Sequence, residues 1–281
     1  MRRTERIKRS NWRLFTWPVL LIGLFWTLFP FYWLTTTALK PNDDMYRPEP
    51  LLVPVRITLE HFHKVFFDSR FPDFFRNSAV VAVSTTVLSL AVGILAAYAI
   101  VRLDFKGKNL LARGLIFSYL VPPVLLFIPL FELVFKLDML NTLQGLVVAY
   151  LTFTVPFTTW LLMGYFRTVP VDLEEAAMVD GCNRFSALLR ITIPLSAPAI
   201  VVTALFSFTL SWNEFLYALT FTSDAASKTV TVGLASTVAE DVFFWGVMMA
   251  ASVLVAIPPV LLYLLGQRWV VSGLTAGAVK Q

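Results

Sequence analysis

The chain has 281 residues, of which 57% are hydrophobic and only 15% charged, and its mean hydropathy is +0.72. A soluble domain of this composition would expose far too much apolar surface, so the sequence indicates an all-α integral membrane protein. The single cysteine, Cys182, excludes a disulfide within the chain, and His61 and His63 lack an obvious third ligand for a metal ion.

Six apolar runs are long enough to cross a hydrocarbon core about 30 Å thick, which takes about 20 helical residues. Basic residues precede the first run, as in a signal peptide. That run is too long for the apolar part of a signal peptide and has no small-residue cleavage site, so we interpret it as a true span. The predicted transmembrane domain covers 14–266 between tails at 1–13 and 267–281. We expect its spans at 14–38, 76–101, 113–135, 143–166, 196–221 and 244–266.

Lys and Arg are unevenly distributed between the two sides of these spans. Fifteen of the 23 lie in the two tails, in the loop 102–113 and in the segment 167–193. Of the other eight, six lie in the loop 40–76, which also has six acidic residues. The positive-inside rule therefore predicts that both termini and the segment 167–193 are cytoplasmic. This topology explains the net charge of +5, so the charge does not indicate nucleic-acid binding.

Two patterns predict local packing. In the outer loop, Leu59, Phe62, Val65 and Phe66 have helical spacing, which favours a short helix at the membrane interface that acts as a packing lid. In the second span, small residues recur every four positions and allow a close helix contact. These small residues are Ser89, Gly93 and Ala97.

The polar segment at about 167–195 separates two apolar runs and predicts two short helices. Asp172 and Glu175 have the spacing of a capping box at the start of the first helix, and Gly181 is expected to end it. Asn183 can cap a second helix that runs to about Arg190. A stiff helix on one face of a membrane protein offers a surface for a partner.

The fifth predicted span ends in a polar and aromatic cluster formed by Trp212, Asn213, Glu214 and Tyr217. Glu214 is the one carboxylate expected at membrane depth, where an ionised group costs about 2.5–3.5 kcal/mol on insertion scales. Two interpretations fit the pattern. The cluster lines a solute path, or Glu214 lies near the outer interface and caps or pairs.

Motifs for chemistry are absent from the sequence. There is no phosphate-binding G-x-x-x-x-G-K-[ST] loop, no G-x-S-x-G and no H-E-x-x-H. We therefore expect a non-catalytic chain that binds no ATP and no metal.

Several segments resemble one family. Glu175-Ala176-Ala177, Asp180-Gly181 and Ile193-Pro194-Leu195 resemble the EAA loop in the permease subunits of bacterial ABC importers of type I. From about residue 12 to the C-terminus, the chain also resembles the smaller permease of maltose-type carbohydrate importers. That likeness rests on Asn77-Ser78, Ala97-Tyr98-Ala99 with Arg102, Trp212-Asn213-Glu214-Phe215 and the tail 272–280.

The resemblance implies a multi-pass subunit of a bacterial inner membrane that forms half of the path for an imported sugar or oligosaccharide. It also implies four partner chains: a homologous permease, two cytoplasmic ATPases that bind ATP and Mg²⁺, and an external solute-binding protein. The EAA loop would be the coupling helix that contacts the ATPase. Its expected residues are Glu174, Glu175, Ala176, Ala177, Asp180 and Gly181. A second expected contact, in the C-terminal tail, comprises Ser272, Gly273, Thr275 and Lys280.

Two alternatives remain open. The same type of importer could carry a solute other than a sugar. A stand-alone secondary transporter would instead use Glu214 as its ion-coupling carboxylate and would need no ATPase.

Overall fold

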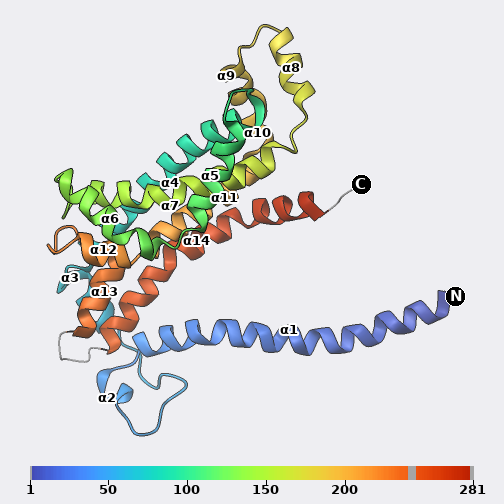
Figure 1. The fold of residues 1–281 in the computed structure, drawn as a ribbon. Coiled ribbons are helices and arrows are strands. Elements are labelled where there is room, and N and C mark those ends of the chain that lie inside the picture. Colours follow the sequence, from blue (N-terminus) through green and yellow to red (C-terminus); the bar gives the residue numbers. More distant parts are fainter. Residues whose placement is uncertain (1, 240–244, 279–281) are drawn as a thin grey trace. The chain divides into compact units, whose positions relative to one another are not determined.

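The computed structural model describes the backbone of residues 2–239 and 245–278, and the side chains of residues 16–236 and 245–270. Within those residues the regular structure is helical (Figure 1). The chain divides into two compact units, which we describe separately. One comprises Met1–Ser69 and Ser236–Ala256, and the other comprises Arg70–Ala235 and Ile257–Gln281.

The smaller unit contains α1 (Arg2–Ala38), α2 (Asn42–Met45) and α3 (Glu60–Phe67). Residues Thr16–Ala38 of α1 are apolar enough to cross a membrane, close to the predicted first span. The short helix predicted in the outer loop is confirmed by α3. Val65 and His61 lie on the buried face of α3. Nε2 of His61 donates to the carbonyl oxygen of Lys40 at 2.9 Å, which holds this helix to the end of α1.

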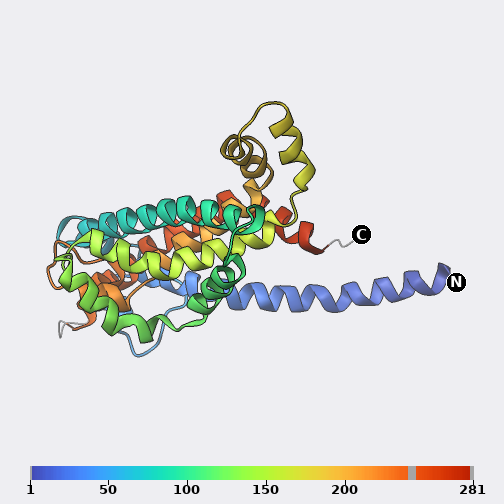
Figure 2. The same ribbon diagram turned by 45° about the horizontal axis from the view of Figure 1, so that its top comes forward.

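The larger unit is built on α4 (Phe71–Arg102), α7 (Leu143–Phe166) and α11 (Ala197–Trp212), which pack side by side (Figures 1 and 2). The close contact predicted from the small residues of α4 is confirmed. Ser89, Gly93 and Ala97 are all buried, and a Cβ on Gly93 would lie 2.5 Å from Cγ2 of Thr158 on α7. Only a residue without a side chain permits this approach.

The predicted third span is not one straight helix. It is broken into α5 (Lys108–Leu120) and α6 (Pro123–Lys136), which are bent by 100° to each other. Pro122 and Pro123 explain the break, since each lacks a backbone donor and each forces the residue before it into an extended conformation. The predicted span over 113–135 therefore corresponds to a bent pair of helices, which is one span only if the pair is counted together.

The predicted fifth span is also interrupted. Its first part is α11, and after a break at 213–215 the chain continues in the short helix α12 (Leu216–Phe221). By contrast, α7 has the predicted bounds of 143–166, and α14 (Trp245–Ala278) contains most of the predicted sixth span. In the described residues, four helices are individually long and apolar enough to cross a membrane, or up to six spans if each bent pair counts as one.

The loop that follows α12 is fixed to the start of α4. Nδ2 of Asn77 donates to the carbonyl oxygens of Ala226 at 2.7 Å and Lys228 at 3.1 Å. The hydroxyl of Ser78 accepts from the backbone N–H of Val230 at 2.8 Å, at the first residue of α13 (Val230–Ala239). The Asn77-Ser78 pair is thus a structural joint between distant parts of the larger unit.

Candidate coupling site and solute path

The polar segment forms a projection at one end of α4 and α7 (Figures 1 and 2). Its first helix, α8 (Val171–Val179), has Pro170 at its N-cap position. Asp172 therefore lies inside the first turn and is not the N-cap residue. The predicted Asp172–Glu175 capping box is wrong, because a proline ahead of the helix already fixes where the helix starts.

The predicted end of this helix and the predicted start of the next are confirmed. Gly181 has a φ of +94°, a left-handed conformation that glycine adopts without strain. Oδ1 of Asn183 accepts from the backbone N–H of Ser186 at 2.8 Å and caps α9 (Arg184–Ala187). The chain then runs through a π-helical turn at Leu188–Thr192 into α10 (Ile193–Leu195), so it stays helical past the predicted end at Arg190.

Glu174 points inward from α8 and is the centre of a buried polar cluster. Its Oε1 accepts from Nε of Arg102 and from the hydroxyl of Thr192, each at 2.8 Å, and its Oε2 accepts from the hydroxyl of Tyr98 at 3.0 Å. The side chains of Arg102 and Glu174 are only 7% and 4% exposed. A buried ion pair is tolerated when such additional hydrogen bonds satisfy its remaining atoms.

The same cluster holds both ends of α8 against the membrane helices. Nη2 of Arg102 donates to the carbonyl oxygen of Val169, just before α8, at 2.7 Å. The hydroxyl of Tyr98 also lies 3.3 Å from the carbonyl oxygen of Arg184, just after the turn at Gly181. Tyr98 and Arg102 both belong to the last turns of α4. These contacts connect both ends of α8 to the last turns of α4.

The predicted coupling residues divide into two groups. Glu175, Ala176, Asp180 and Gly181 are exposed and Ala177 is half-buried, so these five are available to a partner. Glu174 was predicted as part of the same contact, but the structure directs its carboxylate into the protein. The reason is the 100° rotation per helical residue, which turns the two adjacent glutamates to different faces of α8.

Several exposed apolar side chains on α8 and α9 were not among the predicted site residues, and two of them are the most exposed. Val179 is 88% exposed on α8, and Phe185 is 59% exposed on α9. Val179 follows Glu175 and Ala176 by four and three positions, so the three share one helix face. That spacing was the available sequence signal. We call Glu175, Ala176, Val179, Asp180 and Phe185 the coupling surface.

The predicted contact in the C-terminal tail is described only in part. Ser272, Gly273 and Thr275 lie within the backbone of α14, and their side chains are outside the described residues. Lys280 lies outside the described residues altogether. The contact of all four residues with a partner stays a prediction.

The four residues predicted for a solute path differ widely in exposure. Trp212 is 2% exposed and packs edge-on against Phe75, and Tyr217 is 1% exposed. Only Asn213 is exposed, while Glu214 is half-buried. In this conformation the two aromatic rings contribute to internal packing and offer no face to a solute.

Glu214 caps α12. Its Oε1 accepts from the backbone N–H of Tyr217 at 2.9 Å, and its Oε2 accepts from the N–H of Ala218 at 3.0 Å and from the hydroxyl of Tyr150 at 2.7 Å. This geometry matches the capping and pairing interpretation of Glu214. Glu214, in the break between α11 and α12, thus connects the start of α12 to α7 through Tyr150.

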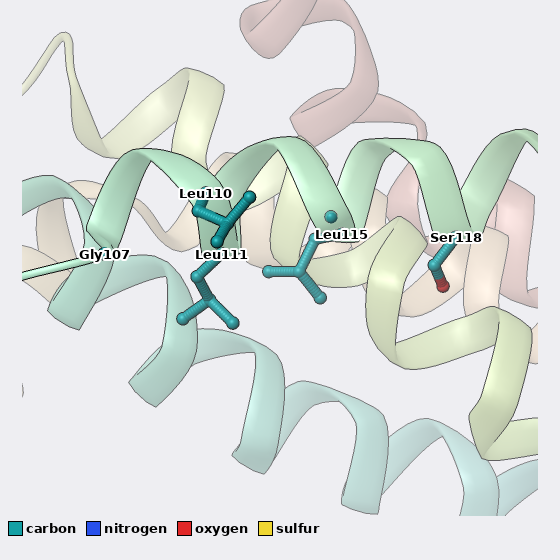
Figure 3. Close-up of a pocket in the computed structure, with 6 residues that line it drawn as sticks. Gly107, Leu110, Leu111, Leu115 and Ser118 are labelled. Carbon is teal, nitrogen blue, oxygen red and sulfur yellow. The ribbon is translucent and has the colours of Figure 1, made fainter.

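No other feature of the described residues suggests chemistry in the larger unit. A hollow of about 450 Å³ on α5 is lined by apolar residues, with Ser118 as its only side-chain hydroxyl (Figure 3). Within the described chain, no three His, Cys, Asp or Glu side chains are grouped so that they could hold a metal ion.

Comparison with known proteins gives concordant matches. Residues 89–275 match the family described as the binding-protein-dependent transport system inner membrane component. The chain is 38% identical to the inner membrane ABC transporter permease protein YcjP of Escherichia coli, over 97% of this chain and 98% of that protein. It is 41% identical to the trehalose/maltose transport system permease protein MalG of Thermococcus litoralis, with 90% and 91% covered.

A further relative is the diacetylchitobiose uptake system permease protein DasC of Streptomyces coelicolor, with 40% identity over 94% of this chain and 96% of that protein. Among solved structures, a chain of a bacterial ABC transporter involved in the import of the acidic polysaccharide alginate superposes with a TM-score of 0.80. That chain is 21% identical, and the match covers 92% of this chain and 96% of that one. The structural match supports the fold.

Proposed function

The chain belongs to the family of binding-protein-dependent transport system inner membrane components, and we propose on that basis that it is a permease subunit of an ATP-driven importer of sugars or oligosaccharides. It would form half of the path through the membrane. Relatives named for trehalose, maltose and diacetylchitobiose transport support a carbohydrate as the cargo.

The observation that carries the proposal is the coupling surface, which is exposed on a helix that the buried ion pair of Arg102 and Glu174 connects to α4. Val179 presents an apolar side chain to water with 88% of it exposed, a position that favours burial against a partner. Glu175 and Asp180 add negative charge around it. A partner pocket that is apolar at its centre and basic at its rim would complement this surface.

We propose that the partner is a cytoplasmic ATPase, with two copies that bind ATP and Mg²⁺ and one homologous permease completing the membrane part. Nucleotide binding would move the ATPases as rigid bodies, and α8 would transmit that movement to α4 through Glu174 and Arg102. Alternation between two global states of the membrane helices follows. In this scheme the chain itself needs no catalytic group.

The proposed topology has both termini and the coupling surface on the cytoplasmic side of a bacterial inner membrane. The excess of Lys and Arg in the tails, the loop 102–113 and the segment 167–193 supports it. The outer loop 40–76 would then face the external solute-binding protein. In the C-terminal tail, Ser272, Gly273, Thr275 and Lys280 are proposed as a second ATPase contact.

The test of coupling is a pair of substitutions at Val179. V179D places a charge at the centre of the proposed contact, whereas V179I keeps an apolar side chain of similar shape. With V179D the ATPases should no longer co-purify and sugar uptake should be lost, while membrane insertion stays unchanged. V179I should retain both. Co-purification of the ATPases with V179D at the wild-type level would contradict the proposal.

A second experiment separates the importer from an ion-coupled transporter. The full assembly in liposomes should take up trehalose, maltose or diacetylchitobiose only with its binding protein and ATP. The isolated chain should move none of them under a proton or sodium gradient. Transport by the isolated chain would instead identify Glu214 as a candidate ion-coupling group and would remove the need for ATPases.

A further inference from the structure

The buried carboxylate of Glu174 is bonded to a second element besides α4. Its Oε1 accepts from Nε of Arg102 and from the hydroxyl of Thr192, each at 2.8 Å. Arg102 belongs to α4, whereas Thr192 is the last residue of the π-helical turn that leads through α10 into α11. Among the described partners of Glu174, Thr192 is the one that does not belong to α4.

The π-helical turn sets the direction of the Thr192 side chain. The backbone N–H of Ile193 donates to the carbonyl oxygen of Leu188, five residues earlier. Such a turn is wider than an α-helical turn, and turns of this kind are rare and often lie at functional sites. Leu188, at its start, is buried against the ends of α4 and α7, and Thr192, at its end, is buried against Glu174. The turn therefore contacts the membrane helices on one side and α8 on the other.

The bend between this turn and α11 is crossed by hydrogen bonds. The two helical segments that meet there are bent by 80°. The backbone N–H of Ser196 donates to the carbonyl oxygen of Thr192 at 2.9 Å, and the N–H of Ile200 donates to the carbonyl oxygen of Ser196 at 3.0 Å. By contrast, Pro122 and Pro123 have no N–H that could bond back across the bend between α5 and α6. We therefore expect the bend at Ser196 to be the stiffer of the two.

The helix α11 extends this connection away from α8. It has 16 residues and is therefore about 24 Å long at 1.5 Å per residue. On the way it is bonded to α7, since the hydroxyls of Ser207 and Thr158 lie 3.0 Å apart. It ends at Trp212, directly before the break that contains Glu214. A shift of Thr192 would therefore reach the residues predicted for the solute path.

We propose that Thr192 is a positioning residue that fixes the start of α11 to α8, so that a movement of α8 displaces α4 and α11 together. The inference rests on the proposed function, because it needs an ATPase that moves α8. Thr192 would act through the carboxylate of Glu174 and would contact neither solute nor nucleotide. Without its hydroxyl, Glu174 still accepts from Arg102 and Tyr98, so α8 stays bonded to α4 and loses only its bond to the segment before α11.

The first test replaces Thr192 in the full assembly, reconstituted with its binding protein and supplied with trehalose, maltose or diacetylchitobiose. T192V keeps the branched shape and removes the hydroxyl. The ATPases should co-purify at the wild-type level, because the coupling surface is unchanged. The amount of sugar transported per ATP hydrolysed should fall by about three- to tenfold, the effect of losing one hydrogen bond to a charged group. T192S keeps the hydroxyl and should restore most of this ratio.

The matched control is Thr203, which is also fully buried and lies on α11 itself. Its hydroxyl donates to the carbonyl oxygen of Ala199 in the same helix at 2.7 Å. T203V therefore removes a buried hydroxyl by the same chemical change without breaking a bond to α8. It should keep the wild-type ratio of sugar to ATP.

A second measurement leaves Thr192 intact. Spin labels on L173C of α8 and L210C of α11, in a C182A background, report the distance between the two helices, and both labelled positions are exposed. If Thr192 fixes α11 to α8, the distance distribution should be narrow and should be the same with and without a non-hydrolysable ATP analogue. Adding T192V should broaden the distribution.

A wild-type ratio of sugar to ATP in T192V, or an equal loss in T203V, would overturn the role of Thr192. So would a change of the distance between α8 and α11 on addition of the ATP analogue to the assembly that retains Thr192, and this outcome decides the question even if T192V fails to assemble. Both results would leave the proposed function intact. Failure of the wild-type assembly to import any of the three sugars with ATP would refute the proposed function itself.

Discussion

Arg102 and Glu174 are 72 residues apart in the sequence, yet Nε of Arg102 lies 2.8 Å from Oε1 of Glu174 and both side chains are more than nine-tenths buried. Burying two charges costs several kcal/mol per ion, so such a pair is a poor source of stability by itself. The pair does fix the orientation of α8 relative to α4, because both side chains make further hydrogen bonds. These bonds can form together only when α8 lies in this position. We interpret the pair as the joint between the coupling surface and α4.

The joint can be tested with a double-mutant cycle. E174Q leaves the guanidinium of Arg102 buried without a counter-charge, and R102M leaves the carboxylate of Glu174 in the same state. Each single substitution should lower the free energy of unfolding by about 3–5 kcal/mol. The double variant should lose clearly less than the sum, since neither charge is then left unpaired. Denaturation in detergent measures the free energy of unfolding of the wild type, both single variants and the double variant.

The functional part of that prediction uses the same variants. If the pair transmits movement, the R102M/E174Q double variant should bind the ATPases through its intact coupling surface while ATP-driven sugar uptake falls. Additive stability losses, or full uptake by the double variant, would contradict the role of a joint.

The next prediction concerns Gly181, whose backbone conformation favours glycine. A Cβ at this position would meet no atom within 4 Å, so the cost of a side chain arises from the φ of +94° and not from crowding. G181V should cost about 1–2 kcal/mol and reorient α9 against α8, which would uncouple ATP hydrolysis from transport. G181N should behave nearly as the wild type, because Asn tolerates the left-handed region.

The control for this prediction is Gly164 on α7, where a Cβ would also be in open space and φ is not positive. G164V should leave transport unchanged. ATP hydrolysis and sugar uptake, measured together on reconstituted assemblies, give the coupling ratio for all three variants. An unchanged ratio in G181V would show that the turn has no part in coupling.

The sequence predicted well whatever depends on local chemistry. The bounds of α7, the turn at Gly181 and the cap at Asn183 follow from neighbouring residues, and each agrees with the structure. The small residues of α4 predicted a close contact, although the partner, Thr158, could come only from the fold.

What the sequence did not predict depends on contacts between distant segments. The inward direction of Glu174 is set by Arg102 and Thr192, which lie 72 and 18 residues away. Pro122 lies at the break between α5 and α6, and Pro170 sets the start of α8 in place of the expected capping box. Burial of Trp212 and Tyr217 likewise depends on how α11 and α12 pack, which residue type alone does not encode.

The contact between α4 and α7 gives a packing prediction. G93A places a methyl group 2.5 Å from Cγ2 of Thr158 and should lower the free energy of unfolding by about 1–3 kcal/mol. T158S removes that Cγ2 and keeps the hydroxyl bonded to Ser207 at 3.0 Å, so it should recover part of the loss in the double variant. Thermal unfolding checks the series, with G164A as the control. Equal stability of G93A and the wild type would show that the helices separate at no cost.

Glu214 provides the last prediction, because its carboxylate accepts three hydrogen bonds from two elements. E214Q replaces one acceptor oxygen by an amide that cannot accept, so a donor at the start of α12 or the hydroxyl of Tyr150 loses its partner. The expected loss is about 1–3 kcal/mol in the free energy of unfolding. Y150F should lose less, because it removes one bond and leaves both backbone donors capped.

The two variants also separate the two roles considered for Glu214. If it caps α12 and pairs with Tyr150, uptake by E214Q and Y150F should fall only as far as their stability falls, and the preference among trehalose, maltose and diacetylchitobiose should stay the same. If Glu214 contacts the solute, E214Q should change that preference at a temperature where the assembly is fully folded, whereas Y150F should not. Competition uptake with pairs of labelled sugars distinguishes these outcomes, since a ratio of two sugars is insensitive to the amount of active importer.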